Sequence, residues 1–383
     1  MDRLNQTSDS PEIILGLMSG TSLDGLDIAM VRWDTESLDS FELMAFETYP
    51  YDESLQNAIM ASITGSAAEI CGMNFRLGSV WAGYVEQFLE NHGLRPEEIS
   101  CIGSHGQTIW HISGESTLQM GEPAVISTRT GIPVVSNFRE HDIAAGGTGA
   151  PLIPFLDWIL FRDLPGNTVV LNIGGIGNIT CISEGCTRDE VKGWDTGPGN
   201  MVVNTLVQLI THGQEDFDRD GALAQKGRID HDLLGKLMDD PFVQQSPPKS
   251  TGREYYTDEY VRDLFPLDEA DTDEARADLV ATASEWTISA VASNVGAFWR
   301  PPESIDRVIV GGGGVHNQFF MERLASYFDN AEIVESGEFG TPVDAKEALG
   351  FAVFARAYRL RQPANLPGVT GAYRSVVLGK LTI

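Results

Sequence analysis

Residues 19–25 (SGTSLDG) follow a short apolar run and combine glycines, hydroxyl groups and one carboxylate. Glycines let backbone N–H groups approach an anion closely, and the hydroxyls of Thr21 and Ser22 add donors. A phosphate would repel Asp24 directly, so we expect this carboxylate to hold a hydrated Mg²⁺ that bridges phosphate oxygens. The same residue types also suit a tight β-hairpin in which they only satisfy the turn. The segment therefore predicts either a phosphate site or a plain hairpin.

Two later glycine clusters have a similar character. Residues 174–178 (GGIGN) interrupt a β-branched run and again read as a turn. Residues 311–314 are four consecutive glycines between an apolar strand and a helical pattern, a junction at which a nucleotide can lie against a helix N-terminus. Four glycines are costly to order, which favours a functional reason for the run.

Other common nucleotide and hydrolase motifs are absent from the sequence. No Gly-x-Gly-x-x-Gly follows the first strand, which excludes a Rossmann fingerprint. Lys249, Ser250 and Thr251 resemble the end of a P-loop, but two prolines precede them where its glycine loop should be. Ser22 is not in a nucleophile elbow, because Asp24 stands where the second glycine is required.

The elements that position these turns follow from changes in hydrophobic period. We expect strands at 13–18, 26–33, 41–49, 99–104, 132–136, 168–173, 179–182 and 307–310, and helices at 67–92, 201–211, 233–238, 278–299, 317–328 and 344–360. Strands that alternate with helices predict an α/β fold, and a glycine hairpin near the start of each half suggests duplication.

Composition limits the partners. The 383 residues are 42% hydrophobic and 21% charged, which is typical of a globular enzyme and suggests two domains. Lys and Arg number 26 against 55 Asp and Glu, so the formal net charge is -29. So negative a surface repels phosphate backbones and anionic lipid, and we expect no nucleic-acid and no membrane partner. An anionic ligand therefore needs backbone donors or a dedicated Arg or Lys.

Cysteines and the N-terminus point to a cytoplasmic protein. Cys181 and Cys186 are close in sequence, but no Cys/His pair follows at zinc spacing, and four cysteines make no secreted disulfide framework. The first eleven residues are polar and lack the apolar stretch of a signal peptide. No apolar run reaches the roughly 18–20 residues that a transmembrane helix needs.

Seven motifs, in order along the chain, resemble those of the anhydro-N-acetylmuramic acid kinase family. They are 16–27 (GLMSGTSLDGLD), 104–108 (SHGQT), 142–154 (DIAAGGTGAPLIP), 172–178 (NIGGIGN), 195–201 (DTGPGNM), 248–254 (PKSTGRE) and 344–348 (DAKEA). Together with the tail at 369–372 they span nearly the whole chain.

The resemblance implies an α/β, two-domain actin/hexokinase-like (ribonuclease H-like) fold with ATP in the interdomain cleft. It suggests an N-terminal domain of residues 11–135 plus 361–383 and a C-terminal domain of residues 136–360. The implied reaction is the hydrolytic opening of 1,6-anhydro-N-acetylmuramic acid with phosphorylation of O6 by ATP. The products are N-acetylmuramic acid 6-phosphate and ADP, in peptidoglycan recycling and amino-sugar catabolism. The resemblance further implies Mg²⁺ as a cofactor and a homodimer.

By the same resemblance the glycine turns face the nucleotide. The residues expected to bind ATP are Gly20, Thr21, Ser22, Leu23, Asp24, Gly25, Leu26, Asp27, Gly174, Gly175, Asn178, Gly312, Gly313 and Asn317. Asp24 would contact Mg²⁺ through water.

The reaction needs a carboxylate general base that polarises the attacking water. Asp195 matches the family position for this base. Residues 193–199 read as a turn that opens a helix, so a helix N-cap is the alternative role for Asp195. Glu347 matches a second carboxylate that resembles a water-orienting partner, although on its own it could be an exposed helix residue.

The lactyl carboxylate of the substrate calls for a cation in so acidic a protein. Arg139 is the candidate and Arg253 the reserve, and either could instead be a solvated surface arginine. Further substrate contacts are expected from Ser104, His105, Gln107, Asp142, Gly199 and Asn200.

Other functions stay open at this point. A kinase of the same fold acting on a neutral anhydrosugar such as levoglucosan would not need Arg139. A non-catalytic ATP-binding regulator would bind ATP without sugar-dependent ADP release, and a plain α/β scaffold would bind no nucleotide.

Overall fold

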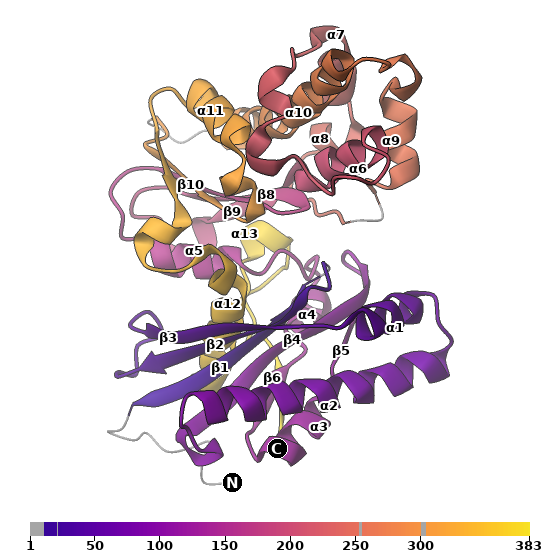
Figure 1. Ribbon diagram of the computed structural model, residues 1–383. Helices are drawn as coiled ribbons and strands as arrows, with labels where there is room; N and C mark the ends of the chain where they lie inside the picture. The colour runs from indigo at the N-terminus through magenta and orange to yellow at the C-terminus, as the bar shows by residue number, and fades with distance from the viewer. Residues whose placement is uncertain (1–10, 21, 253–254, 300–303) are drawn as a thin grey trace. The chain divides into compact units, whose positions relative to one another are not determined.

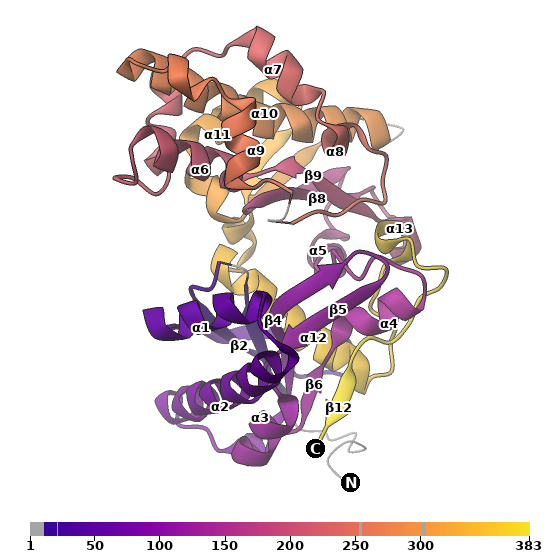
Figure 2. The same cartoon turned by 90° about the vertical axis from the view of Figure 1, so that its right-hand side faces the viewer.

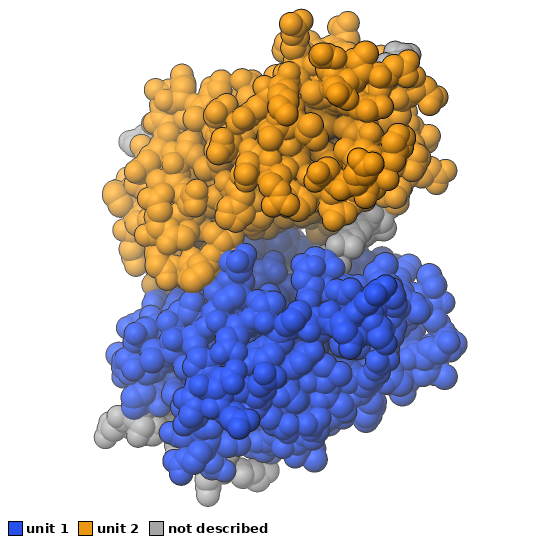
Figure 3. All heavy atoms as spheres, in the orientation of Figure 1, with its two compact units in different colours: residues 1–156, 344–383 blue, residues 157–343 orange. Residues whose placement is uncertain are grey.

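The computed structural model describes residues 11–20, 22–252, 255–299 and 304–383. The chain divides into two compact units, unit 1 with residues 1–156 and 344–383 and unit 2 with residues 157–343 (Figure 3). The sequence expectation placed the domain boundaries at 135/136 and 360/361, and these boundaries stay a prediction.

Unit 1 is built on a mixed sheet with the strand order β12-β6-β4-β1-β2-β3, to which β5 adds by pairing with β4. The strands are β1 (Glu12–Ser19), β2 (Gly25–Trp33), β3 (Glu42–Pro50), β4 (Ile99–Ile112), β5 (Ser116–Met120), β6 (Val134–Ser136) and β12 (Lys380–Thr382). The first three strands are antiparallel, whereas β4 is parallel to both β1 and β6.

Helices cover both faces of this sheet (Figures 1 and 2). On one face lie α1 (Glu53–Ile63), α2 (Ala67–Asn91) and α3 (Pro123–Thr130), whose apolar side chains join those of the strands in one core. A capping box formed by Ser66 and Glu69 starts α2, since each satisfies a backbone N–H of the other. On the other face, α12 (Lys346–Arg359) packs on β1, β2 and β4. Two shorter helices complete the unit, α4 (Phe138–Ala144) and α13 (Pro367–Thr370).

Two glycines allow α12 to lie directly on the sheet. Gly16 of β1 and Gly103 of β4 are register partners. A Cβ at Gly16 would come within 1.9 Å of the Ala348 carbonyl oxygen, and a Cβ at Gly103 within 2.1 Å of the Phe351 carbonyl oxygen. Because backbone atoms cannot move aside cheaply, both positions require glycine, and this contact fixes the beginning of α12, which carries Glu347.

Unit 2 contains a five-stranded sheet in the order β11-β10-β7-β8-β9. Its strands are β7 (Thr168–Ile173), β8 (Ile176–Ile182), β9 (Lys192–Pro198), β10 (Arg307–Gly311) and β11 (Glu332–Glu335). Its helices are α5 (Pro154–Phe161), which begins in unit 1, α6 (Asn200–Ile210), α7 (His231–Met238), α8 (Pro241–Gln244), α9 (Asp258–Leu264), α10 (Asp273–Phe298) and α11 (Gln318–Tyr327). The main core lies between α6, α10, α11 and one face of the sheet, and a small cluster with Phe161 covers the opposite face.

Both sheets follow one plan. In each, an antiparallel meander of three strands is extended from its first strand by two parallel strands: β1–β2–β3 with β4 and β6, and β7–β8–β9 with β10 and β11. The turn between the first two strands is glycine-rich in both cases. The predicted α/β, two-domain actin/hexokinase-like fold is confirmed, and the repeated strand order fits the suggested duplication.

Several elements differ from the sequence expectation. The strand expected at 99–104 continues to Ile112 as β4 and pairs with β5, which was not expected. β9, α1 and α3 were not expected either. Within the described ranges of the chain, none of the helices has the length and apolar character needed to cross a lipid bilayer.

Candidate functional site

The turn between β1 and β2 is held from behind by a chain of buried polar groups. The Ser19 hydroxyl donates to Gln107 Oε1 at 2.6 Å and lies 2.8 Å from the Tyr51 hydroxyl. Trp81 Nε1 donates to Tyr51 at 2.8 Å, and Gln107 Nε2 donates to the Gly20 carbonyl at 3.2 Å. Gln107, expected to bind substrate, therefore uses its amide to position the first turn.

The turn itself presents unused donors. Leu23 adopts a left-handed backbone with φ of 62°, and its N–H donates to the Gly20 carbonyl at 3.3 Å. The N–H groups of Ser22 and Asp24 donate to no acceptor within the described residues, and both side chains are exposed. Of the expected nucleotide-binding residues here, Thr21 lies outside the described residues. Exposed N–H groups of a turn suit the binding of an anion.

Gly25 and Leu26 have structural roles beside this turn. A Cβ at Gly25 would come within 2.4 Å of the Tyr49 carbonyl oxygen, so only glycine allows β3 to lie this close. Leu26 is fully buried in the core of unit 1.

Carboxylates gather next to the first turn. Burial raises the pKa of Asp27, the Thr48 hydroxyl bonded to it at 2.6 Å lowers it, and the negative charges of Asp344 and Asp24 raise it further. Burial among protein atoms also raises the pKa of Glu347, although its side chain reaches the surface, whereas the charge of Arg139 lowers it. A divalent cation would relieve the repulsion between these carboxylates.

The carboxylates do not form a direct metal cage. In the part of the chain that the structure describes, no group of three or more His, Cys, Asp or Glu side chains is arranged to hold a metal ion. Mg²⁺ keeps several water ligands and binds through one or two carboxylates plus substrate phosphates. The exposed Asp24 fits this mode of binding through water.

The side chains of Arg139 and His105 are in direct contact in unit 1. Arg139 Nε and Nη2 lie 3.2 and 2.9 Å from His105 Nε2, and Arg139 Nη1 donates to the Gly149 carbonyl at 2.9 Å. Burial first and the arginine charge second lower the pKa of His105 far below its usual value, so the imidazole is neutral and accepts. A guanidinium has five N–H donors. Arg139 is thus a positioned cation whose charge acts on Glu347.

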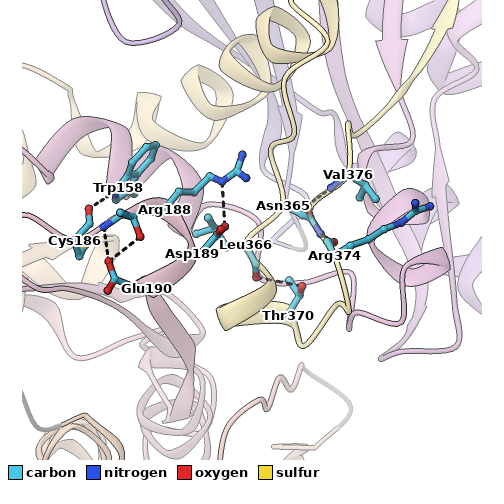
Figure 4. Close-up of polar contacts among 11 residues, drawn as sticks. Trp158, Cys186, Arg188, Asp189, Glu190, Asn365, Leu366, Thr370, Arg374 and Val376 are labelled. Atoms are coloured by element: carbon cyan, nitrogen blue, oxygen red, sulfur yellow. Dashed lines mark hydrogen bonds and ion pairs between the residues drawn. The ribbon is translucent and has the colours of Figure 1, made fainter.

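Asp142 is a structural hub in unit 1. Its carboxylate accepts from the Gly149 N–H at 2.8 Å, from Asn365 Nδ2 at 2.8 Å and from the Thr370 hydroxyl at 2.7 Å. Asn365 in turn binds the backbone of Val376 and Arg374 (Figure 4). With three donors on a fully buried carboxylate, Asp142 ties residues 147–149 to the C-terminal tail. Its expected contact with sugar stays a prediction.

Ser104 is likewise enclosed. It is 1% exposed, and its hydroxyl has no hydrogen-bond partner among the described residues. Ser104 is in register with Leu17 on β1 and shares its face of the sheet, toward the core with α1, α2 and α3 and away from α12. Its expected contact with sugar stays a prediction.

In unit 2 the turn between β7 and β8 is joined to the start of α6. The N–H groups of Gly199 and Met201 donate to the Gly175 carbonyl at 2.9 and 3.1 Å, and that of Asn200 donates to the Gly174 carbonyl at 2.8 Å. A Cβ at Gly199 would come within 2.4 Å of the Gly174 carbonyl oxygen, so glycine is required. The N–H groups of Gly174 and Gly175 donate to no described acceptor, which leaves them available to an anion.

Asp195 lies inside β9 and is only 6% exposed, which corrects the expectation of a turn residue at a helix start. Gly199 is the N-cap of α6 instead. The Thr251 N–H donates to Asp195 Oδ2 at 2.8 Å, and the Asp195 N–H donates to the Lys249 carbonyl at 3.3 Å. A backbone N–H that binds a carboxylate favours its ionised form.

A polar row crosses the sheet beside Asp195. Gly311, Asn172, Asn178 and Asp195 are successive register partners on β10, β7, β8 and β9. Side chains of directly paired residues share a face, and the neighbouring apolar residues at 171, 179 and 194 belong to the core with α6 and α10. The three polar side chains therefore lie on the opposite face of the sheet. Asn172 shares this row with Asp195, and the sequence expectation did not include it, although it belongs to the same motif as Asn178.

The third glycine cluster borders a pocket of about 420 Å³. Gly312 has φ of 77°, and a Cβ there would come within 2.7 Å of Asn172 Oδ1. Gly313 and Asn317 line the pocket together with Asn200, which was expected to bind sugar. The sequence expectation missed the rest of the lining: Val203, Asn204, Phe217, Asp218, Arg219, Asp220 and His316. A larger cavity of about 700 Å³ is lined by α7, α10 and α11 and contains none of the expected site residues.

Comparison with known proteins shows the family to which this chain belongs. Residues 12–383 match the model of the family described as anhydro-N-acetylmuramic acid kinase. An anhydro-N-acetylmuramic acid kinase from Caldanaerobacter subterraneus subsp. tengcongensis is 41% identical over 398 residues, with 100% of both chains covered. One from Bacillus thuringiensis subsp. konkukian is 39% identical, covering 96% of this chain and 98% of the relative. Among solved structures, component A of the Acidaminococcus fermentans (R)-2-hydroxyglutaryl-CoA dehydratase is 12% identical, with 91% of this chain and 99% of that chain covered and a TM-score of 0.45. The full-length match and the identity to its members place this chain in the anhydro-N-acetylmuramic acid kinase family.

Proposed function

We propose that this chain uses ATP to open 1,6-anhydro-N-acetylmuramic acid with water and to phosphorylate O6. The observation that carries the proposal is the placement of Asp195, a nearly buried carboxylate bonded to the Thr251 N–H and in register with Asn178, next to a turn with available N–H donors. Such an arrangement suits a fixed general base beside a phosphate site.

In the proposed step, Asp195 accepts a proton from water as the water oxygen forms a bond to C1 of the sugar. The C1–O6 bond breaks, O6 forms a bond to the γ-phosphorus of ATP, and the bond between that phosphorus and the β,γ-bridging oxygen breaks. The products are N-acetylmuramic acid 6-phosphate and ADP. Glu347 would orient the water, and the charge of Arg139 favours its ionised form.

We assign phosphate binding to the turns at 20–25 and 174–175 and adenosine binding to the pocket beside Gly313 and Asn317. Mg²⁺, when bound, would neutralise charge on the phosphates, and Asp24 would hold it through water. That ATP occupies the cleft between the two units stays a prediction.

The cation for the lactyl group remains Arg139, because its guanidinium is fixed by His105 and Gly149. Arg253, the reserve, lies outside the described residues. A homodimer and a cytoplasmic location, both expected from the sequence, are also proposals; sedimentation at several protein concentrations would test the first.

The test of the proposed function is a coupled assay of ADP formation with three inputs: anhydro-N-acetylmuramic acid, levoglucosan and no sugar. We expect rapid ADP release only with the muramoyl substrate. Preference for levoglucosan would support the neutral-sugar alternative, and ATP binding without sugar-dependent ADP release would support a non-catalytic regulator.

A further inference from the structure

Residues 249–251 form a strap along the free edge of β9, where Asp195 lies. One hydrogen bond joins the Asp195 N–H to the Lys249 carbonyl at 3.3 Å, and a second joins the Thr251 N–H to Asp195 Oδ2 at 2.8 Å. The position of this strap therefore decides whether the carboxylate keeps its backbone donor.

The Lys249 side chain anchors the strap in the interior of unit 2. The residue is 3% exposed, and its Nζ donates to the carbonyl oxygens of Phe242 and Val243 at 2.8 and 3.0 Å. Nζ also lies 4.8 Å from the ring centroid of Phe242 and 5.8 Å from that of Phe298. Lysine is rarely this buried unless its charge is paired, so the site is built to hold this ammonium group.

The acceptors of Lys249 are themselves fixed. Asn294 Nδ2, on α10, donates to the same Val243 carbonyl at 3.2 Å and to the Ala290 carbonyl at 2.9 Å. Asp240 caps the short helix α8 by accepting from the Val243 N–H at 2.9 Å. The strap is thereby connected through Lys249 to the rigid core around α10.

We propose that Lys249 is a positioning residue for the general base: its ammonium group fixes residues 249–251 so that the Thr251 N–H remains on the Asp195 carboxylate. The proposal rests on the proposed function, since it assumes that Asp195 is the base. The P-loop likeness of the Lys-Ser-Thr sequence has a different explanation here, because the lysine is directed to protein carbonyls.

Burial and the neighbouring carboxylates have opposite effects on the pKa of Lys249. Burial lowers the pKa of Lys249 to about 8, while Asp195 on β9 and Asp240 at the start of α8 raise it. The hydroxyls of Tyr255 and Tyr260 both bind Asp240, and Tyr256, whose own pKa is raised chiefly by burial, faces both carboxylates. Lys249 is thus positively charged below about pH 8 and neutral above it.

The first experiment compares Lys249→Met with Lys192→Met, a control at the exposed start of β9. We expect Lys249→Met to lower kcat by about 100-fold, as a displaced catalytic group would. KM for ATP should stay within about twofold, because the adenosine pocket is elsewhere in unit 2. The acid limb of the pH–kcat profile should move to higher pH, because a carboxylate that loses a donor and a nearby cation holds its proton more tightly.

A second experiment remains informative if Lys249→Met fails to fold. Lys249→Arg keeps its charge at all accessible pH values, whereas the wild-type lysine loses its charge above about pH 8. We expect the kcat of the wild type to fall by about two- to tenfold between pH 7.5 and 9.5, as for the loss of one neighbouring charge. The profile of Lys249→Arg should stay flat over that range, whatever its absolute rate.

Identical alkaline limbs in the wild type and Lys249→Arg would overturn the inference, as would a Lys249→Met enzyme with the kcat and acid limb of Lys192→Met. A fall in thermal stability and in ATP affinity together, with an unchanged pH profile, would show a purely structural lysine and also overturn it. The Asp195→Asn enzyme separates the role of Asp195 from that of Lys249. If Asp195→Asn keeps the wild-type kcat, the assignment of Asp195 as the base is wrong. If Asp195→Asn is inactive while Lys249→Met is fully active, only the role of Lys249 is contradicted.

Discussion

Among the individual residues, Arg139 and Glu347 are coupled by charge. Arg139 lowers the pKa of Glu347, which burial and Asp27 raise above its ordinary value of 4.5. Glu347 therefore takes up its proton at higher pH than a glutamate with the ordinary pKa, and we expect activity on the acid side to fall at a correspondingly higher pH. Arg139 limits this effect while its guanidinium is held by His105 and Gly149.

Removing this cation should change two measurements at once. We expect Arg139→Ala to move the acid limb of the pH–kcat profile to higher pH and to raise KM for anhydro-N-acetylmuramic acid, because the nearby positive charge and the partner of the lactyl carboxylate are both lost. KM for levoglucosan should not change. An unmoved acid limb in Arg139→Ala would show that its charge does not reach Glu347.

Asp24 gives a separate prediction about the metal. We expect Asp24→Ala to raise the Mg²⁺ concentration needed for half-maximal rate by about tenfold, as is usual when an outer-shell ligand partner is removed. Excess Mg²⁺ should restore much of the rate. Glu36→Ala, which removes an exposed charge elsewhere in unit 1, serves as the control, and equal Mg²⁺ titrations for both variants would argue against a metal role for Asp24.

At the level of secondary-structure elements, the contact of α12 with β1 and β4 depends on Gly16 and Gly103. We expect Gly16→Ala to lower the free energy of unfolding by about 1–3 kcal/mol, since the added Cβ meets a backbone carbonyl at 1.9 Å. Chemical denaturation would measure the change.

The matched control for that substitution is Gly72→Ala. Gly72 lies on the exposed side of α2 with nothing within 4 Å of an added Cβ, so alanine should raise the stability by about 0.5–1 kcal/mol through helix propensity. If both substitutions had equal effects, the close approach of α12 to the sheet would be refuted.

These elements also show what the sequence could and could not reveal. Glycine turns and β-branched runs predicted the hairpins, because turn chemistry is local. β9 was missed because residues 192–198 contain glycines, a proline and Asp195, and only pairing with β8 makes them a strand. The same pairing places Asn172, Asn178 and Asp195 in one row, which no local pattern contains.

At the scale of the whole molecule, the formal net charge of -29 bears on stability. Like charges destabilise a compact state, and salt screens them. We expect Tm to rise by a few degrees between 0.05 and 1 M KCl, about the range over which the Debye length shrinks from above 10 Å to 3 Å. A Tm that falls or stays constant over this range would show that self-repulsion is already offset in the fold.

Seven ordered motifs predicted the family and the fold because each motif is a short continuous segment that can be recognised in the sequence alone. Contacts that depend on tertiary packing could not be predicted from the sequence. They are the three hydrogen bonds donated to Asp142, the hydrogen bond by which Gln107 holds the first turn, and the burial of the Lys249 side chain. In each case a polar residue that suggested substrate binding, or no role, is engaged by protein groups that only the folded chain brings next to it.

The central claim, that Asp195 activates the attacking water, is tested most directly by the rate of sugar-dependent ADP release from the Asp195→Asn enzyme. The substitution retains the size of the side chain and removes the base. We predict that kcat falls by about two to four orders of magnitude while the affinity for ATP stays close to that of the wild type. An Asp195→Asn enzyme that releases ADP at the wild-type rate with anhydro-N-acetylmuramic acid would contradict the account.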